Sequence, residues 1–356
     1  MKQDVQIEKL YGILRREIMR LPEGGKFHSV REMIRRYGVH RAIVDAALDR
    51  LEAEKLIYRR NRLGIFSNVP AAAAELRLRL FHLEWPSSTI MEWVESITEY
   101  VETHSRWKLT VGRIQERGSF DRLDISGCDA LIMILNNQLL QERRNIDWLN
   151  RLGCPAVILD AEIGALPFNT VRSCDWFGMM EACRFLFDRG HRTVAYIRTE
   201  PAFPGLLQLA DCFRKAAEML GMKVVMIDSE VFYGEFSREK CTSYIQGYLD
   251  AHGGRCPFSA AFCESYDPAV GIAETLERNG IRIPEEVSIM TRGTLRSASA
   301  SVPLTLVAAD FERETAEVFE GLTRLYRKEI SCFKKFLPMR VIDRGSVADI
   351  GSALSG

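Results

Sequence analysis

The chain has 356 residues, of which 47% are hydrophobic and 27% charged, and its 48 Lys and Arg balance 48 Asp and Glu. This composition is that of an ordinary globular protein and argues against a disordered, fibrous or coiled-coil chain. The longest aliphatic run, residues 130–135, is far shorter than the roughly 18 residues of a membrane-spanning segment. Because the chain also starts without a secretory signal, we expect a cytoplasmic protein of two or three domains with no membrane partner.

The zero net charge is unevenly divided along the chain. Residues 1–70 carry 15 Lys and Arg against 9 Asp and Glu, which leaves 33 against 39 for the remainder. A basic segment of net charge +6 therefore precedes an acidic segment of net charge −6. Such asymmetry is a reason to look for a nucleic-acid partner of the basic segment.

Neither the cysteines nor the histidines predict a metal site. The nine cysteines are scattered and include no C-x-x-C pair, which favours free, reduced thiols over disulfides or zinc ligands. The six histidines are dispersed, and none has a metal-ligand spacing to Cys, Asp or Glu. Phosphate-loop, dinucleotide-binding, nucleophile-elbow and zinc-protease motifs are also missing from the sequence. We therefore expect no cofactor, no metal and no enzymatic activity.

The basic segment begins with three predicted helices. Apolar residues recur every three or four positions over residues 5–19, which predicts an amphipathic helix. Ser29 can cap a second helix over residues 30–37, which Gly38 ends. A third helix is expected over residues 41–55. The short turn between the second and third helices predicts a helix-turn-helix.

Two short strands are expected next, at residues 56–60 and 65–67, on either side of the turn 61–64. Together with the three helices they make a winged helix-turn-helix domain over residues 1–70. About 60 residues of this segment resemble the GntR-type winged-helix regulators. The matching stretches are residues 27–33, 37–41 and 48–60.

The resemblance implies that Arg31 and Arg41 touch DNA and that the wing tip around Gly64 enters the minor groove. Arginine at the start of a recognition helix can bind guanine or grip a phosphate. Ser29 has the alternative role of a helix cap alone, and His40 stands where the family usually has Ser or Thr. The candidate DNA contacts are Ser29, Arg31, His40, Arg41, Arg59, Arg60, Arg62 and Gly64. One module of charge +6 binds DNA weakly, so two copies are implied.

Beyond an alanine-rich linker at residues 71–76, strand-like runs alternate with helical patterns. This alternation predicts an α/β fold in which helices flank parallel sheets. Two halves of about 100 residues each, a usual domain size, indicate a two-lobed domain over residues 77–346 with a cleft between the lobes. The expected lobes are 77–172 with 306–333 and 173–305 with 334–346, followed by a tail at 347–356.

The acidic segment resembles the LacI/GalR family. The similarity rests on the stretches 189–197, 280–289 and 303–307, with further matches at 337–338 and 344–346. It implies a periplasmic-binding-protein-like effector domain whose chain crosses between the lobes three times, near residues 172, 305 and 334. It also implies homodimerisation through this domain, which would supply the second DNA-binding module.

Ligands of open α/β sheets collect at the carboxyl ends of the strands. The candidate effector-binding residues at such ends are Trp85, Asp160, Glu264, Ser265, Tyr266 and Arg292. Asp160 stands where LacI/GalR relatives have an acidic residue that bonds a sugar hydroxyl. Ser265, Tyr266 and Arg292 depart from the family's sugar-contacting residues, so a sugar is only the default ligand.

These observations predict a sequence-specific, dimeric transcriptional regulator. Its expected partners are double-stranded operator DNA and a small-molecule effector, a sugar or a related compound, and its expected role is to repress a carbohydrate-catabolism operon. Two alternatives stay open. The winged helix could contact protein or RNA as a scaffold, or the chain could bind a small molecule through a vestigial effector site.

Overall fold

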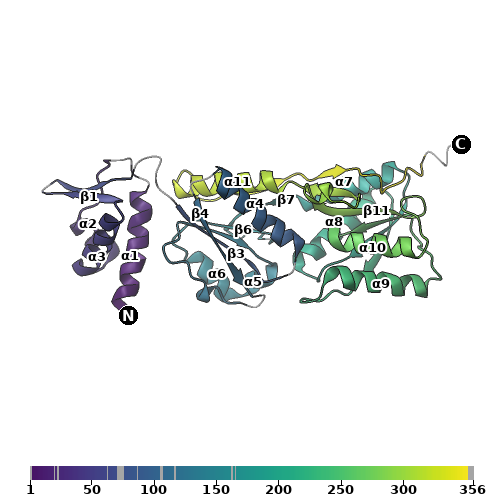
Figure 1. Ribbon diagram of the computed structural model, residues 1–356, viewed down its shortest axis with the longest axis horizontal. Coiled ribbons are helices and arrows are strands. Elements are labelled where there is room, and N and C mark those ends of the chain that lie inside the picture. Colours follow the sequence, from purple (N-terminus) through teal and green to yellow (C-terminus); the bar gives the residue numbers. More distant parts are fainter. Residues whose placement is uncertain are drawn as a thin grey trace.

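Three bodies lie in a row along the long axis of the molecule: a small N-terminal domain and two α/β lobes (Figure 1). The computed structural model describes residues 2–19, 21, 24–61, 63–69, 76–85, 87–104, 107–115, 118–161, 163–164 and 166–351. Arg62, residues 71–75 of the expected linker and residues 352–356 of the expected tail lie outside these ranges. In the part described, no helix has both the length and the apolar character needed to cross a membrane.

The N-terminal domain is a winged helix, as predicted. Its elements are α1 (Lys2–Ile18), α2 (Val30–Tyr37), α3 (Arg41–Ala53), β1 (Ile57–Arg60) and β2 (Gly64–Ser67). The Ser29 side chain accepts a hydrogen bond from the Glu32 N–H, while the Glu32 carboxylate accepts one from the Ser29 N–H, which confirms the predicted cap of α2. Gly38 ends α2 with a left-handed φ of 62°. Buried Leu14 of α1, Met33 of α2 and Leu48 of α3 belong to one core that packs the three helices together.

The lobe nearer to the winged helix, lobe 1, contains a six-stranded, fully parallel sheet of order β13-β7-β6-β5-β3-β4. The strands are β3 (Leu76–Leu83), β4 (Trp107–Ile114), β5 (Ala130–Ile134), β6 (Ala156–Leu159), β7 (Asn169–Ser173) and β13 (Lys334–Leu337). The helices are α4 (Ser88–His104), α5 (Asn137–Gln141), α6 (Arg143–Asn150) and α11 (Phe311–Tyr326), with a 3-10 turn at Phe120–Arg122. Every residue of β5 is buried, as expected for a central parallel strand covered on both faces.

The distal lobe, lobe 2, has a sheet of order β14-β12-β11-β10-β8-β9, in which only β14 is antiparallel. The strands are β8 (Thr193–Arg198), β9 (Lys223–Asp228), β10 (Ala260–Cys263), β11 (Ser288–Thr294), β12 (Thr305–Ala309) and β14 (Arg340–Ile342). The helices are α7 (Asp175–Asp188), α8 (Pro204–Met219), α9 (Ser237–Ala251) and α10 (Tyr266–Arg278), with a 3-10 turn at Ser297–Ser299. The predicted α/β fold with parallel sheets is therefore confirmed.

The chain crosses between the lobes three times, at positions that differ in part from the expected ones. The first crossing follows β7, close to the predicted residue 172. The second follows β12, because Thr305–Ala309 pairs with β11 in lobe 2. The third follows β13, because Lys334–Leu337 pairs with β7 in lobe 1. The boundaries expected after residues 305 and 333 therefore fall a few residues too early, since strand pairing and not local pattern sets them.

Candidate nucleic-acid interface and ligand cavity

The N-terminus of α3 presents an exposed arginine. His40 is the N-cap residue of α3, and its side chain makes no capping bond. The Arg41 side chain is 78% exposed, and its Nε lies 3.3 Å from the Asp45 carboxylate one turn further along. An exposed ion pair of this kind contributes little stability. The Arg41 guanidinium can therefore exchange Asp45 for a DNA base or phosphate at small cost.

The wing arginines are more constrained than the sequence indicates. Arg59 pairs with the carboxylates of Asp49, at 2.6 Å, and Glu52, at 3.2 Å, both on α3. The Arg60 guanidinium lies over the Tyr58 ring, 5.3 Å from its centroid. A phosphate contact by Arg59 has to compete with two carboxylates, so Arg59 also has a structural role in holding the wing against α3.

A groove runs between the wing and the start of α2. Of the predicted contacts, Ser29, Arg59, Arg60 and Gly64 line it, whereas Arg31 lies exposed on α2. Its lining also includes Lys26 and Asn61, which were not among the predicted DNA contacts. Lys26 forms an isolated antiparallel bridge with Phe66 of the wing. Lys26 could have been identified as a candidate DNA contact, because it is basic and directly precedes the GntR-like stretch 27–33.

The cap at Ser29 provides a test of its structural role. We expect Ser29→Ala to destabilise the winged helix by about 1 kcal/mol, because a free N–H at the start of α2 loses its acceptor. Ser29→Asp restores the cap and should recover most of the loss. Hydrogen exchange of α2 amides measures the effect, and an unchanged exchange rate in Ser29→Ala would show that the cap contributes nothing.

A cavity of about 120 Å³ lies between the two lobes. Five of the six predicted effector-binding residues line it: Trp85, Asp160, Glu264, Ser265 and Arg292. The structure does not bring Tyr266 into this cavity. Its hydroxyl donates to the Val302 carbonyl, and its side chain lines a smaller neighbouring pocket. The reason is that Tyr266 is already the first residue of α10, which turns its side chain away from the strand end.

The cavity is also lined by residues that were not among the predicted ligand contacts. The polar and aromatic ones are Ser87, Thr89, Asn136, Asn137, Arg172, Asp175, Glu200, Phe203 and Tyr233. Asn136 and Asn137 follow β5 and could have been found by the same strand-end rule. Tyr233 and Phe203 come from loops of lobe 2, whose path no local pattern reveals.

Three polar groups in the cavity wall lack partners among the described residues. The Asn136 Oδ1 accepts from the Leu139 N–H, but its buried Nδ2 has no acceptor. The Nε of Arg292 is likewise buried without an acceptor. Asp160, held at a left-handed φ of 61°, makes no hydrogen bond or ion pair within the described chain and faces the open cavity. Unsatisfied buried donors are costly, so these groups are suited to a ligand that both accepts and donates hydrogen bonds.

Burial controls the protonation of the cavity carboxyls. Desolvation raises the pKa of Glu264 to about 8, although Tyr196 Oη donates to it at 2.8 Å and the Thr199 N–H at 3.1 Å. Desolvation raises the pKa of Asp160 to about 6, and the nearby Arg292 and Arg172 guanidinium groups oppose the shift. Asp160 is exposed where it lines the cavity, whereas Glu264 is 1% exposed, so desolvation affects Asp160 less than Glu264. Asp160 is therefore mainly ionised at neutral pH, whereas Glu264 keeps most of its proton.

The raised pKa of Glu264 predicts a pH-dependent stability. Between the ordinary glutamate pKa of 4.5 and about 8, the folded chain retains a proton that the unfolded chain has lost. The free energy of unfolding should therefore fall as pH rises through this window, by at most about 1.4 kcal/mol per pH unit for one proton. Glu264→Gln cannot titrate and should show a shallower fall in urea unfolding at pH 5, 6.5 and 8. The exposed Glu277→Gln is the control, and equal slopes in both variants would contradict the prediction.

Aromatic side chains from both lobes meet at the cavity. The Trp85 and Tyr233 ring centroids are 4.1 Å apart, and Tyr233 Oη donates to the Glu84 carbonyl at 3.2 Å. Phe203 approaches Tyr233 edge-on, with ring centroids 6.3 Å apart. Because Trp85 follows β3 of lobe 1 and Tyr233 belongs to a loop of lobe 2, this contact has to break when the lobes separate. The aromatic pair can cover the flat face of a ring-shaped ligand.

The chemistry of the cavity is that of hydrogen bonding, charge pairing and stacking. The described residues include no group of three or more His, Cys, Asp or Glu side chains placed to hold a metal ion. All nine cysteines are free thiols.

The fold and the two sites define a winged-helix protein with a two-lobed periplasmic-binding-protein-like domain. Residues 6–66 match the family described as bacterial regulatory proteins, gntR family, and residues 183–347 match a periplasmic binding protein-like domain. The chain therefore carries a GntR-type domain followed by a periplasmic-binding-protein-like domain.

Individual relatives are distant. The HTH-type transcriptional repressor CytR of Escherichia coli K12 is 23% identical over 195 residues, 54% of this chain and 55% of CytR, so the similarity spans about half of each protein. The lac repressor dimer bound to operator and the anti-inducer ONPF is 15% identical, with a TM-score of 0.65 over 78% of this chain and 96% of the other. A LacI family transcriptional regulator from Enterococcus faecium with bound ribose is 19% identical, with a TM-score of 0.63 over 76% and 99% of the two chains. At these identities the two structures establish the shared fold alone.

Proposed function

We propose that this protein is a sequence-specific transcriptional regulator whose DNA affinity is set by a small molecule in the cavity between the lobes. The observation that carries the proposal is the presence, in one chain, of an exposed Arg41 at the start of α3 and of polar groups in the cavity between the lobes that have no partner among the described residues. The name of one similar protein, the transcriptional repressor CytR, favours repression over activation. Repression of a carbohydrate-catabolism operon by a cytoplasmic homodimer is the most specific form of the proposal.

The DNA-binding part of the proposal rests on position and charge. Arg31, His40 and Arg41 are all exposed on the helix-turn-helix, and Lys26, Arg60 and Gly64 extend this surface along the wing. A helix N-terminus that carries arginine is suited to base edges in the major groove, and a wing to the backbone or the minor groove. One such module neutralises only a few phosphates, so two copies acting together account better for tight, salt-sensitive binding.

The ligand part of the proposal rests on size and polarity. An engineered cavity of about 150 Å³ is known to hold a benzene ring, so a cavity of about 120 Å³ has room for a compact ring. Asp160 offers an acceptor, Asn136 and Arg292 offer donors, and Trp85 offers an aromatic face. A ring with several hydroxyl groups matches this combination, so a monosaccharide or a related polyol is the proposed class.

Selection of duplexes from a random library by the full chain tests the DNA-binding proposal. We expect enrichment of a two-fold symmetric site, because a symmetric dimer places two recognition helices on one duplex. A thermal-shift screen of the full chain against monosaccharides, followed by titration of the selected duplex with any compound that raises Tm, tests the effector. Failure to enrich any sequence, with equal binding to single-stranded RNA, would favour the scaffold alternative.

A further inference from the structure

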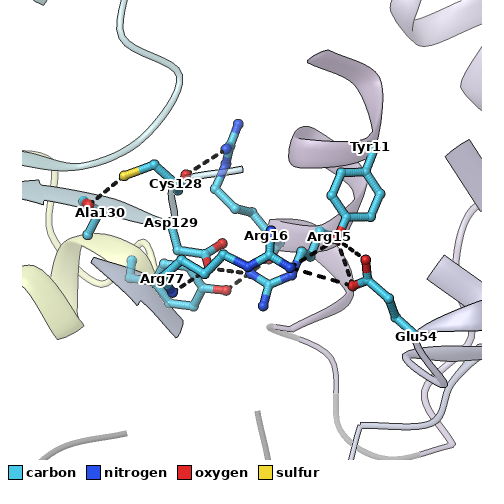
Figure 2. A network of polar contacts seen from close by, with 9 residues as sticks. Tyr11, Arg15, Arg16, Glu54, Arg77, Cys128, Asp129 and Ala130 are labelled. Carbon is cyan, nitrogen blue, oxygen red and sulfur yellow. Dashed lines mark hydrogen bonds and ion pairs between the residues drawn. The ribbon is translucent and has the colours of Figure 1, made fainter. Parts of the chain in front are cut away.

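The winged helix is docked onto lobe 1 through a buried polar contact (Figure 2). Arg15, near the end of α1, is 5% exposed and forms an ion pair with Asp129 of lobe 1, which is 1% exposed. The same Asp129 carboxylate oxygen accepts a hydrogen bond from the Arg77 N–H at 2.8 Å. Asp129 therefore binds the DNA-binding domain and the backbone of β3 at once. We call the pair of Arg15 and Asp129 the interdomain latch.

A second set of contacts surrounds the interdomain latch. The Arg77 guanidinium donates to Tyr11 Oη at 3.4 Å, and Tyr11 Oη donates to the Glu54 carboxylate at 2.6 Å (Figure 2). Arg16 donates to the Cys128 carbonyl at 3.1 Å. These contacts join α1 and the end of α3 to the amino-terminal ends of β3 and β5, so the winged helix has a defined orientation on lobe 1.

The interdomain latch and the cavity lie at opposite ends of the same two strands. Asp129 immediately precedes β5, and Arg77 is the second residue of β3. The strands are parallel neighbours, with Arg79 opposite Leu131 and His82 opposite Ile134. Beyond their carboxyl ends come Asn136 and Trp85, which line the cavity. A movement of β3 relative to β5 at the cavity end of the strands therefore also shifts Arg77 relative to Asp129 at the interdomain latch.

We propose that β3 and β5 couple the cavity to the winged helix, and that the docked arrangement is the form that binds DNA. This proposal rests on the proposed function and names how its two sites communicate. A buried ion pair is either formed or fully broken, because a partly separated pair leaves a buried charge without a counter-charge, which is costly. Small shifts of packed strands can therefore release the latch as a whole. Docking leaves the Arg41 side chain 78% exposed, so it does not cover the recognition helix.

The first experiment tests docking without DNA or ligand. In Asp129→Asn, the charge partner of Arg15 is lost while the shape is kept. We expect hydrogen exchange over residues 10–18 of α1 to be at least roughly tenfold faster than in the unmodified chain. The matched control is Asp124→Asn, which removes the carboxylate of an exposed pair with Arg79 on the same lobe, 3.1 Å apart. Equal hydrogen-exchange rates of residues 10–18 in the two variants would show that the Arg15–Asp129 pair does not hold the winged helix on lobe 1.

The second experiment tests coupling in the reverse direction, because linkage between two sites is reciprocal. Binding of a duplex selected by the full chain should slow hydrogen exchange at the cavity segments 87–92 and 229–236 by at least about fivefold, the low end of typical coupling. In Asp129→Asn at saturating duplex this slowing should be lost, whereas Asp124→Asn should keep it. Slowing that persists in Asp129→Asn overturns the proposal. Failure of the unmodified chain to select a duplex contradicts the proposed function instead, and the first experiment still decides whether the latch exists.

Discussion

Arg41→Ala should weaken binding of the full chain to its selected duplex by about 5- to 150-fold, which corresponds to about 1 to 3 kcal/mol. Arg41 is the first residue of α3, is 78% exposed and, among the described residues, pairs only with the half-exposed Asp45. Little structure therefore changes when its side chain is removed, and the loss falls on the DNA contact. Because a base contact also carries specificity, discrimination between the selected duplex and a variant sequence should fall together with affinity.

The matched control is Arg143→Ala on α6. Arg143 also starts its helix, is 93% exposed and pairs with a carboxylate four residues on, Asp147, at 3.8 Å. It lies in lobe 1, outside the proposed DNA-binding surface, so its removal should leave the affinity unchanged. Both titrations are performed at one salt concentration, since affinity for DNA depends steeply on salt. Equal affinities of the two variants would remove Arg41 from the interface.

Asp160→Ala should abolish the effector response while leaving DNA affinity without effector unchanged. The Asp160 carboxylate is a charged acceptor with no partner in the described chain, and it faces a cavity in which a ligand hydroxyl can reach it. Hydrogen bonds to a charged group contribute about 1.5 to 3 kcal/mol, so its loss should weaken the ligand by roughly 10- to 150-fold. At a ligand concentration only a few times the Kd of the unmodified protein, the unmodified protein is mostly bound and the variant should remain largely unbound.

Two measurements check this expectation with a monosaccharide that raises the Tm of the unmodified chain. The thermal shift should disappear in Asp160→Ala, and titration of the protein–duplex complex with the sugar should no longer release DNA. Asp147→Ala, an exposed acidic residue of lobe 1, serves as the control and should keep both responses. An unchanged dose–response curve in Asp160→Ala would exclude Asp160 from the effector site.

The winged helix could be predicted from sequence almost element by element. Its helices are amphipathic, and Ser29 and Gly38 are local signals whose capping and left-handed conformations the structure confirms. The GntR-like pattern also lies within one continuous stretch of the chain. What the pattern did not contain was the pairing of Arg59 with Asp49 and Glu52, because these residues meet only when the wing folds against α3.

Part of the cavity lining could be predicted from sequence, because the carboxyl ends of neighbouring parallel strands lie on the same side of a sheet. Trp85, Asp160 and Glu264 each follow a strand, and the structure brings them together with Arg292 in one cavity. Tyr266 lies outside the cavity because α10 begins at this residue. The pattern of strands in the sequence does not locate this helix boundary. Phe203 and Tyr233 were missed because long-range packing of the loops of lobe 2, and not any local repeat, places them across from Trp85.

The two kinds of domain, their order and the division of charge between them can be inferred from the sequence alone, because caps, periodicity and residue type act locally. How these parts meet depends on the tertiary structure. Asp129 is one acidic residue among many in the sequence, and its importance comes from burial against Arg15, which lies 114 residues away in the chain. Contacts between residues so far apart depend on the whole fold, and so the link between the winged helix and the cavity appears only in three dimensions.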